Sequence, residues 1–291
     1  MDEAVSLGVL IEAPPEQVWE AISSEAGQQR WLMRAAFTAR EEAPLRHFGF
    51  DQGRKVVYLG EVLAVEPGRR LLFTWQQVTP ADWGARTLIS LTLRPEGHGT
   101  HLSVHHSGWA GVAPRLRLAA RQGALESWPE ALLDLRMALE NAPRRAGVLL
   151  TLDAPAAEVF GALTRADALR HWFPHRLLAW EPDPGRRLAL DLRRDPGGTV
   201  YRMEGKVLRR VENELFAYTW QLDGWPGGST VAYALDEGAG GTRLFIDHTG
   251  FDGFTERERL RAVRQMQAGW EQAAALLRRH LEGDRAAIHA G

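Results

Sequence analysis

Histidine is the residue type in this sequence best suited to proton transfer or metal binding, and the chain of 291 residues contains ten of them. His101, His105 and His106 fall on one predicted strand, where side chains alternate between the two faces. His101 and His105 therefore share a face, while His106 points to the other. A metal site needs three or more converging ligands, and no carboxylate pattern accompanies these histidines. We therefore expect no bound metal and no metal ligands.

One of these histidines is repeated later in the chain. The segment His106-Ser107-Gly108-Trp109 recurs as His248-Thr249-Gly250-Phe251. A histidine beside such a Gly-aromatic corner either hydrogen-bonds the turn or reaches a binding pocket, and the sequence leaves both interpretations open. Arg243 and Asp247 stand where the first half has His101 and His105, so the polar positions of the two halves differ.

Aromatic residues are the second group that could do chemistry, because an indole offers an apolar wall and an N–H that donates to a ligand oxygen. The chain has 11 tryptophans, and several recur at matching positions in its two halves. The alternative is that these rings are core residues, since a buried tryptophan anchors packing. The candidates for lining a ligand cavity are Trp31, Trp75, His106, Trp109, Trp128, Trp172, Phe173, Tyr201, Trp220, Trp225, His248, Phe251, Met266 and Trp270.

The sequence lacks the usual catalytic signatures. It contains no Gly-x-Ser-x-Gly elbow, no His-Glu-x-x-His, no Walker sequence and no dinucleotide fingerprint. It also has no cysteine, which excludes thiol nucleophiles, disulfides and thiolate zinc sites. Asp191, Glu204 and Asp247 could act as general bases only if the fold buries them. We therefore favour a protein that is not an enzyme, with no catalytic residues and no cofactor.

An internal repeat organises all of these positions. The segment Val9–Trp19 matches Leu150–Phe160, because each has an apolar strand, then proline, then an aliphatic–aromatic pair. Further blocks follow in the same order at a nearly constant offset, which chance does not produce. The blocks are Arg30-Trp31 with His171-Trp172, Gly60 with Gly205, Thr74-Trp75-Gln76 with Thr219-Trp220-Gln221, Thr100 with Thr242, and Trp128 with Trp270. We predict a first domain over 1–142 and a second over 143–291, with a short polar linker near 141–145.

Each half is predicted to contain the same elements. Strands are expected where apolar residues alternate, and a long helix where they recur every three or four residues. In the first half Pro129 predicts a kink or a new start near Ser127, and in the second Asp153 is expected to cap the first helix. The predicted strands are 5–12, 55–63, 71–75 and 88–93, then 147–153, 200–207, 215–220 and 230–235, and the long helices are 125–139 and 260–281.

One identity within the sequence does not belong to the repeat. Pro67–Leu71 and Pro184–Leu188 share all their letters but do not share the offset, so we interpret them as turns at different places. The glycine-rich segments 95–99 and 237–241 lie between predicted strands and are expected to be hairpin turns rather than phosphate-binding loops.

The order of elements defines the fold class. A strand, two short helices, a run of antiparallel strands and a long C-terminal helix make a helix-grip arrangement. The prediction is an α+β protein with two helix-grip domains, each a curved antiparallel sheet wrapped around a long C-terminal helix. A sheet that curves around one amphipathic helix leaves a space, which is the default ligand site. The uninterrupted helix 260–281 favours the second domain if only one pocket functions.

Composition limits the partners. The formal net charge of −2 gives no global field that would attract nucleic acid or a membrane surface. No apolar run approaches the roughly 20 residues of a membrane span, and the first residues are acidic where a signal peptide is basic. We expect a soluble, cytoplasmic protein whose partner is a small hydrophobic molecule, with no nucleic-acid or membrane partner.

Several of these motifs together resemble a known family. The Ile11–Trp19 segment, the Arg30-Trp31 pair, the strands with Gly60 and Thr74-Trp75, and the late tryptophan helix are similar to activator-of-Hsp90-ATPase homologue (AHSA1-like) domains of the START/Bet v1-like (SRPBCC) superfamily. The resemblance covers 5–141 and again 146–283. It implies a helix-grip fold with a cavity for a lipid-like or aromatic molecule. The eukaryotic co-chaperone of this group carries a distinct Hsp90-binding domain whose place is taken here by a second cavity domain, so we do not expect an Hsp90-type chaperone as partner.

Three hypotheses for function follow. The first is a binder of a small hydrophobic or aromatic ligand in an internal cavity, with a stress-related role among its uses. The second is a cyclase- or hydrolase-like enzyme that uses the same cavity, which predicts an ionisable group facing the cavity in one domain only. The third is a protein-interaction module, including an Hsp90 co-chaperone-like one, which predicts a large exposed apolar patch.

Overall fold

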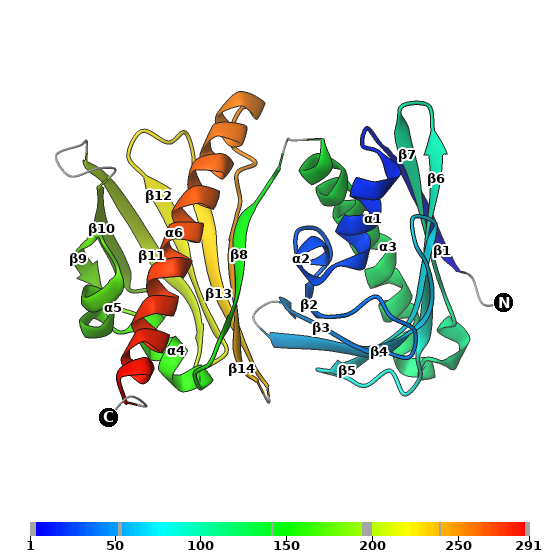
Figure 1. Cartoon of the computed structure of the whole chain (residues 1–291), viewed down its shortest axis with the longest axis horizontal. Helices are drawn as coiled ribbons and strands as arrows, with labels where there is room; N and C mark the ends of the chain where they lie inside the picture. The colour runs from blue at the N-terminus through cyan, green and yellow to red at the C-terminus, as the bar shows by residue number, and fades with distance from the viewer. Residues whose placement is uncertain (1–3, 52–53, 141–142, 194–199, 239, 289–291) are drawn as a thin grey trace. The chain divides into compact units, whose positions relative to one another are not determined.

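The computed structural model describes residues 4–51, 54–140, 143–193, 200–238 and 240–288. The chain divides into two compact domains, Met1–Pro143 and Arg144–Gly291. Residues 141–142 of the predicted linker lie outside the described part. Each domain has its own hydrophobic core between a sheet and helices, and Figure 1 shows the long helix of each domain lying along one face of that domain's sheet.

The first domain is one antiparallel sheet with three helices. Its strands pair in the order β1-β7-β6-β5-β4-β3-β2, and a short 3-10 turn at Trp109–Gly111 precedes the last helix. The elements are β1 (Val5–Ile11), α1 (Pro15–Ser23), α2 (Glu25–Gln28), β2 (Arg34–Ala36), β3 (Pro44–Asp51), β4 (Arg54–Glu66), β5 (Arg70–Thr79), β6 (Thr87–Glu96), β7 (Gly99–Ser107) and α3 (Pro114–Leu139).

The second domain repeats this plan. Its strands pair in the order β8-β14-β13-β12-β11-β10-β9, which is the same topology strand for strand. The elements are β8 (Ala146–Leu152), α4 (Ala156–Thr164), α5 (Ala166–Trp172), β9 (Arg176–Trp180), β10 (Arg187–Arg193), β11 (Val200–Val211), β12 (Leu215–Leu222), β13 (Ser229–Gly238), β14 (Gly241–Thr249) and α6 (Glu256–Ile288). No helix in the described part of the chain is long and apolar enough to cross a membrane.

The predicted helix-grip fold is confirmed, but four strands were missed. They are β2 and β3 in the first domain and β9 and β10 in the second. In β10 the alternation of Leu188, Leu190 and Leu192 was legible in the sequence. In β3 a histidine and a glycine occupy the inward positions and hide the period. The shared letters at Pro67 and Pro184 do form turns at different places, one between β4 and β5 and the other between β9 and β10.

Of the two alternatives predicted from Pro129, the new helix start near Ser127 is wrong, because α3 runs unbroken through Pro129 with Trp128 and Leu132 buried on either side of it. That burial offsets the one helix hydrogen bond that a proline removes. The kink stays a prediction. Asp153 does not cap α4 either, because the helix begins later, after Pro155, and its N-cap makes no side-chain hydrogen bond.

The repeated glycines have a steric cause. A Cβ atom at Gly60 would collide with the carbonyl oxygen of Thr74, and one at Gly205 would collide with that of Thr219. At the same places the threonine hydroxyl accepts a hydrogen bond from the next residue of the glycine strand, at 2.9 Å in both domains. These contacts fix the register of the strand pair that carries Trp75 in one domain and its counterpart in the other.

Candidate functional site

The repeated histidines lie in the cores of their domains. His106 on β7 and His248 on β14 are both buried. In the first domain, Trp128 Nε1 donates a hydrogen bond to His106 Nδ1 at 3.2 Å, and His106 Nε2 lies 2.8 Å from Thr87 Oγ1. Thr87 Oγ1 in turn donates to the carbonyl of Trp75 at 2.6 Å. We call this chain of hydrogen bonds the histidine bridge.

The second domain contains the same bridge. Trp270 Nε1 donates to His248 Nδ1 at 3.2 Å, His248 Nε2 lies 2.7 Å from Ser229 Oγ, and Ser229 Oγ donates to the Trp220 carbonyl at 3.0 Å. An indole N–H only donates, so Nδ1 is the acceptor and a neutral imidazole carries its hydrogen on Nε2. Burial lowers the pKa of His106 and of His248 to about 3, consistent with neutral rings. Each bridge ties the long helix to the sheet.

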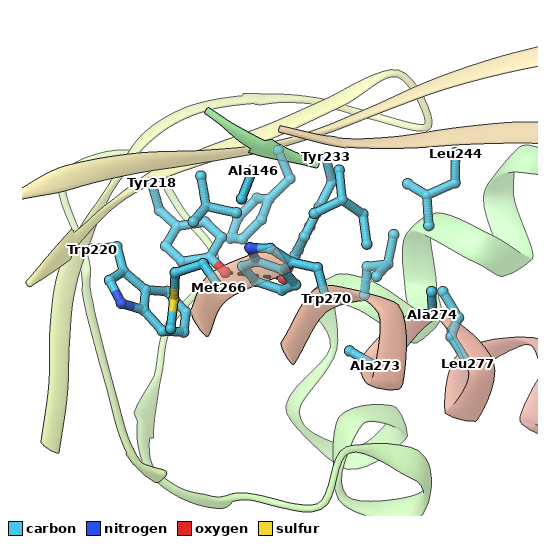
Figure 2. Close-up of a cluster of buried hydrophobic side chains, with 14 of the residues drawn as sticks. Ala146, Tyr218, Trp220, Tyr233, Leu244, Met266, Trp270, Ala273, Ala274 and Leu277 are labelled. Carbon is cyan, nitrogen blue, oxygen red and sulfur yellow. Dashed lines mark hydrogen bonds between the residues drawn. The ribbon is translucent and has the colours of Figure 1, made fainter. Parts of the chain in front are cut away.

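A cavity of about 380 Å³ opens in the second domain among α6, the α5–β9 connection and strands β10, β11 and β12. Figure 2 shows Trp220, Met266 and Trp270, three of its wall residues, in one cluster beneath the sheet. The lining residues are Phe173, Pro174, His175, Leu192, Tyr201, Trp220, Leu222, Gln265, Met266, Ala268, Gly269, Trp270, Gln272 and Ala273. The wall is therefore mostly apolar and aromatic.

The mouth of the cavity follows one stripe of α6. Gln265, Gly269 and Gln272 recur at helical spacing and are exposed or half-buried, whereas Met266 and Trp270 are buried. A Cβ atom built at Gly269 meets no other atom within 4 Å, so there is open space in front of this glycine. Gly269 therefore borders open space at the edge of the cavity.

Trp220, one of the wall residues of this cavity, has an unsatisfied donor. Its side chain is 3% exposed, and its Nε1 has no hydrogen-bond partner among the described residues. Leaving a buried donor unpaired costs about 1–3 kcal/mol, and most such groups in proteins are paired. The ring lies 5.6 Å from that of Trp270 at 64°, and in Figure 2 its nitrogen is on the edge turned away from Trp270.

His175 and Tyr201 are the titratable residues in the lining. Burial lowers the pKa of His175, and its ring packs edge-on to Phe173 at 4.8 Å. A neutral imidazole at a cavity wall can accept a proton near neutral pH. The described part of the chain holds no group of three or more histidines, cysteines and carboxylates that could bind a metal ion.

The carboxylates considered as general bases lie outside the lining. Asp191 pairs with Arg202 at 3.3 Å, and Glu204 pairs with Arg187 at 2.7 Å. Asp247 is half-buried on β14 and does not line the cavity either. Acid–base chemistry in this cavity would therefore rest on His175 and Tyr201.

The first domain has rings where the second has aliphatic side chains. By strand register, His47 corresponds to Leu190 and Tyr58 corresponds to Met203. The rings of His47 and Tyr58 each lie 4.7 Å from that of Trp75. Trp75 is therefore covered by aromatic neighbours, whereas its counterpart in the second domain lines the cavity.

His47 is a buried histidine that we did not single out from the sequence. Its Nε2 lies 2.6 Å from Gln28 Oε1, while Gln28 Nε2 donates to the Ile22 carbonyl at 2.8 Å. This orientation makes Gln28 Oε1 the acceptor and places the hydrogen of His47 on Nε2. Burial lowers the pKa of His47 to about 3, so the ring is neutral.

A second hollow, of about 440 Å³, lies in the first domain between α1, α2 and the end of α3. Trp31 lines it together with charged residues of α1. The indole of Trp31 donates to the Ala21 carbonyl at 3.0 Å, and that of Trp172 donates to the Ala162 carbonyl at 2.9 Å in the second domain. This repeated pair thus ties the first short helix of each domain to the end of the second short helix or the residues just after it.

The predicted cavity residues therefore separate into three groups. Five of them line the cavity of the second domain: Phe173, Tyr201, Trp220, Met266 and Trp270. Trp31 lines the hollow of the first domain. The others lie in or against the two cores: Trp75, His106, Trp109, Trp128, Trp172, Trp225, His248 and Phe251. Trp225, placed in a loop by the sequence, packs on Phe251 and Phe254 at 5.9 and 5.3 Å between ring centres.

The lining residues missed from the sequence are mainly those of the mouth and of the unpredicted strand β10. They are Pro174, His175, Leu192, Leu222, Gln265, Ala268, Gly269, Gln272 and Ala273. A signal for the mouth was present, because the polar stripe with Gln265, Gly269 and Gln272 runs beside the apolar stripe of the same helix.

Comparison with protein families identifies the repeat unit. The family model described as Activator of Hsp90 ATPase homolog 1-like protein matches residues 12–140 and again 153–282. The chain belongs to this family. It holds two activator-of-Hsp90-ATPase homologue domains in tandem, as the sequence motifs predicted. A comparison with curated protein sequences finds no match.

Solved structures of similar organisation exist for this tandem family member. The di-domain ARO/CYC StfQ from the steffimycin biosynthetic pathway is 17% identical, with a TM-score of 0.46 over 97% of this chain and 99% of that one. The di-domain ARO/CYC BexL from the BE-7585A pathway is also 17% identical, with a TM-score of 0.45 over 96% and 99%. Protein MLL2253 from Mesorhizobium loti is 30% identical, with a TM-score of 0.41 over 47% and 97%. The function of this chain does not follow from these similarities.

Proposed function

We propose that this protein binds a small hydrophobic or aromatic molecule in the cavity of its second domain. The observation that carries the proposal is the cavity itself, which has about 380 Å³ and a mostly apolar wall that includes the rings of Phe173, Tyr201, Trp220 and Trp270. This volume lies within the range of about 300–1,000 Å³ that is usual for small-molecule sites. Burial of apolar ligand surface against Trp220, Trp270 and Tyr201 supplies the affinity, at about 25 cal/mol for each Å².

The cavity can be blocked without disturbing the fold. Gly269 faces open space at the mouth, so a phenylalanine there would extend into the cavity rather than collide with the protein. Gly123 offers a matched control, because it is an exposed glycine in the long helix of the first domain with equally open space around it. Both substitutions replace a helical glycine by the same side chain, and only one of them obstructs the cavity.

The test uses the neutral fluorescent probe N-phenyl-1-naphthylamine with the full chain. Wild type and the Gly123→Phe variant are expected to enhance the fluorescence of the probe with the same saturation curve. The Gly269→Phe variant is expected to bind at least about tenfold more weakly, because the ring occupies the site. Equal binding by all three proteins would refute the proposal, and so would no binding by the wild type.

A cyclase- or hydrolase-like reaction in the same cavity is the second candidate. The observation that favours it is His175, an ionisable group in the cavity lining, since the strand register places Met33 at the equivalent position of the first domain. A neutral imidazole there is suited to act as a general base.

Hydrolysis of 4-nitrophenyl acetate tests this candidate. The His175→Gln variant is expected to lose the protein-dependent rate, while the exposed His171→Gln variant keeps it. Activity that persists in His175→Gln, or a wild-type rate no higher than that of buffer, would exclude His175 as the base.

A further inference from the structure

We infer that His248, a residue outside the lining of the second-domain cavity, is the positioning residue that holds Trp270 in the cavity wall and so keeps the cavity open for a ligand. The inference rests on the proposed function, because it assigns a role in the same ligand site. Three features of the structure carry it: the contacts of His248 with two wall residues, the direction of its hydrogen bonds, and a matched bridge in the first domain.

His248 packs against two residues of the cavity wall without lining the cavity itself. Its side chain is 0% exposed and does not belong to the lining, whereas Trp220 and Trp270 do. The centre of the imidazole lies 5.5 Å from the ring of Trp220 and 6.0 Å from that of Trp270. Phe251 and Trp225 also pack on it, with ring centres 4.8 and 6.3 Å away. Four rings therefore hold the imidazole, and two of them belong to the cavity wall.

The hydrogen bonds of His248 have one consistent direction. The Trp220 carbonyl only accepts, so the Ser229 hydroxyl donates to it and its oxygen accepts from His248 Nε2. Nδ1 of the neutral ring is then an acceptor, and the Trp270 indole N–H, which only donates, pairs with it at 3.2 Å. The bridge thus joins the backbone of one wall tryptophan to the side chain of the other.

Trp270 depends on this acceptor for its orientation. Its side chain is 5% exposed, and within the described part of the chain its N–H bonds to His248. Removal of the acceptor would leave this buried N–H unsatisfied, at a cost of about 1–3 kcal/mol. The cavity of about 380 Å³ lies beside the ring, so the indole is expected to turn towards it, where water satisfies the N–H. A turned ring would occupy part of the cavity and obstruct a ligand.

The first domain contains the same bridge at a tryptophan that does not line its hollow. Trp128 donates to His106 Nδ1 at 3.2 Å, and the two ring centres lie 6.1 Å apart. Trp128 is not among the residues that line the hollow between α1, α2 and α3. Loss of the acceptor is therefore expected to reduce stability in both domains but to affect ligand binding only in the second. The repeat supplies an internal control for the positioning role.

Substitutions at His248 can remove its two hydrogen bonds one at a time. An asparagine carries its side-chain oxygen close to the place of Nδ1, so His248→Asn keeps the acceptor for Trp270 and loses the donor to Ser229. A glutamine carries its side-chain nitrogen close to the place of Nε2, so His248→Gln keeps the donor and loses the acceptor. Both variants lose the ring, and His248→Gln is the one expected to release Trp270.

Binding of N-phenyl-1-naphthylamine to the full chain measures the effect. Wild type, His248→Asn and the first-domain control His106→Gln are expected to bind the probe with Kd values within about threefold of one another. His248→Gln is expected to bind it at least about tenfold more weakly, because the unsatisfied N–H turns the ring into the site. Circular dichroism of each variant before titration establishes that it is folded.

A measurement on the wild type needs no variant. In the ¹⁵N-labelled protein, a scalar coupling between Trp270 Nε1 and His248 Nδ1 across their hydrogen bond is expected. The coupling should persist when the probe binds, because the bridge forms before a ligand enters. Its absence from the folded wild type would refute the positioning role, whatever the variants show.

The outcomes separate this inference from the proposed function. If the wild type does not bind the probe, or if Gly269→Phe binds it equally well, the proposed function fails and the inference fails with it. If the wild type binds and His248→Gln binds as tightly, the cavity remains a ligand site and the positioning role is refuted. If His248→Asn loses binding as His248→Gln does, the acceptor at Nδ1 is not the cause, and the inference is refuted as well.

Discussion

Acidification from about pH 7 to about pH 5 is expected to destabilise the first domain more than the second. The cause is the number of histidines that are buried as neutral rings. The first domain holds His47 and His106, and the second holds His248, each with its pKa lowered by burial from 6.5 to about 3. In the unfolded chain these rings regain their usual pKa and bind protons as the pH falls, whereas in the folded domains they stay neutral.

The sign and the size of the effect follow from proton linkage. A histidine whose pKa is lower in the folded than in the unfolded state binds its proton more tightly when the chain unfolds. It therefore lowers the free energy of unfolding as the pH falls below 6.5, and this loss grows until about pH 3. At about 1.4 kcal/mol for each pH unit, acidification to about pH 5 costs about 2 kcal/mol for each histidine. The first domain therefore loses about 4 kcal/mol and the second about 2 kcal/mol. His175, partly exposed with a lowered pKa, adds a contribution of the same sign in the second domain.

Urea unfolding of the full chain, followed by tryptophan fluorescence at both pH values, measures these losses. His47→Leu, which copies Leu190 of the second domain, assigns the transition of the first domain and should reduce its loss on acidification by about 2 kcal/mol. The exposed His98→Leu should leave the loss unchanged. An equal pH dependence in wild type and His47→Leu would refute the assignment of His47 as a neutral buried ring.

Three further predictions concern single residues of the second domain. Gly269→Ala should raise stability by about 0.5–1 kcal/mol, because alanine favours the helix and its Cβ has open space; a decrease in the urea midpoint would contradict that space. Ser229→Ala should lower the free energy of unfolding by about 1–3 kcal/mol, because it leaves His248 Nε2 without its acceptor. Ser229→Thr, which copies Thr87 of the first domain, should be close to wild type in the same urea assay. Gly205→Ala should lower the free energy of unfolding by about 1–3 kcal/mol, because its Cβ collides with the Thr219 carbonyl. Gly238→Ala, which has open space around its Cβ, should not be destabilised in this way. Similar losses in the two variants would show that the collision is not the cause.

The repeat made most of the fold predictable. The duplication is visible because some residues have the same structural role in both copies. Gly60 and Gly205 each lie too close to a carbonyl oxygen of the next strand for a side chain to fit. His106 and His248 each form a histidine bridge. Strand β3 was not predicted, because His47 interrupts its alternation of apolar residues. Pro129 suggested a break that tertiary packing of α3 overrides.

The candidate site was predictable only in part. Trp128 and Trp270 are equivalent in sequence, spacing and hydrogen bonding, and both pack in a core, yet Trp270 also lines the cavity. The difference comes from residues distant in sequence, where Leu190 and Met203 replace the rings of the first domain. Local patterns cannot report such a difference, because it depends on which side chains the sheet brings together. The unpaired donor of Trp220 likewise becomes visible only when all of its neighbours are placed.

The most direct test of the ligand site is a crystal structure of the full chain soaked with 6-bromo-2-acetonaphthone, with data collected at the bromine absorption edge. The anomalous signal locates the bromine atom without reference to the protein density. A peak between α6 and β12, with the probe in contact with the rings of Trp220 and Trp270, is the predicted result. A peak confined to the hollow between α1, α2 and α3, or no peak at all, would contradict the assignment of the second-domain cavity as the ligand site.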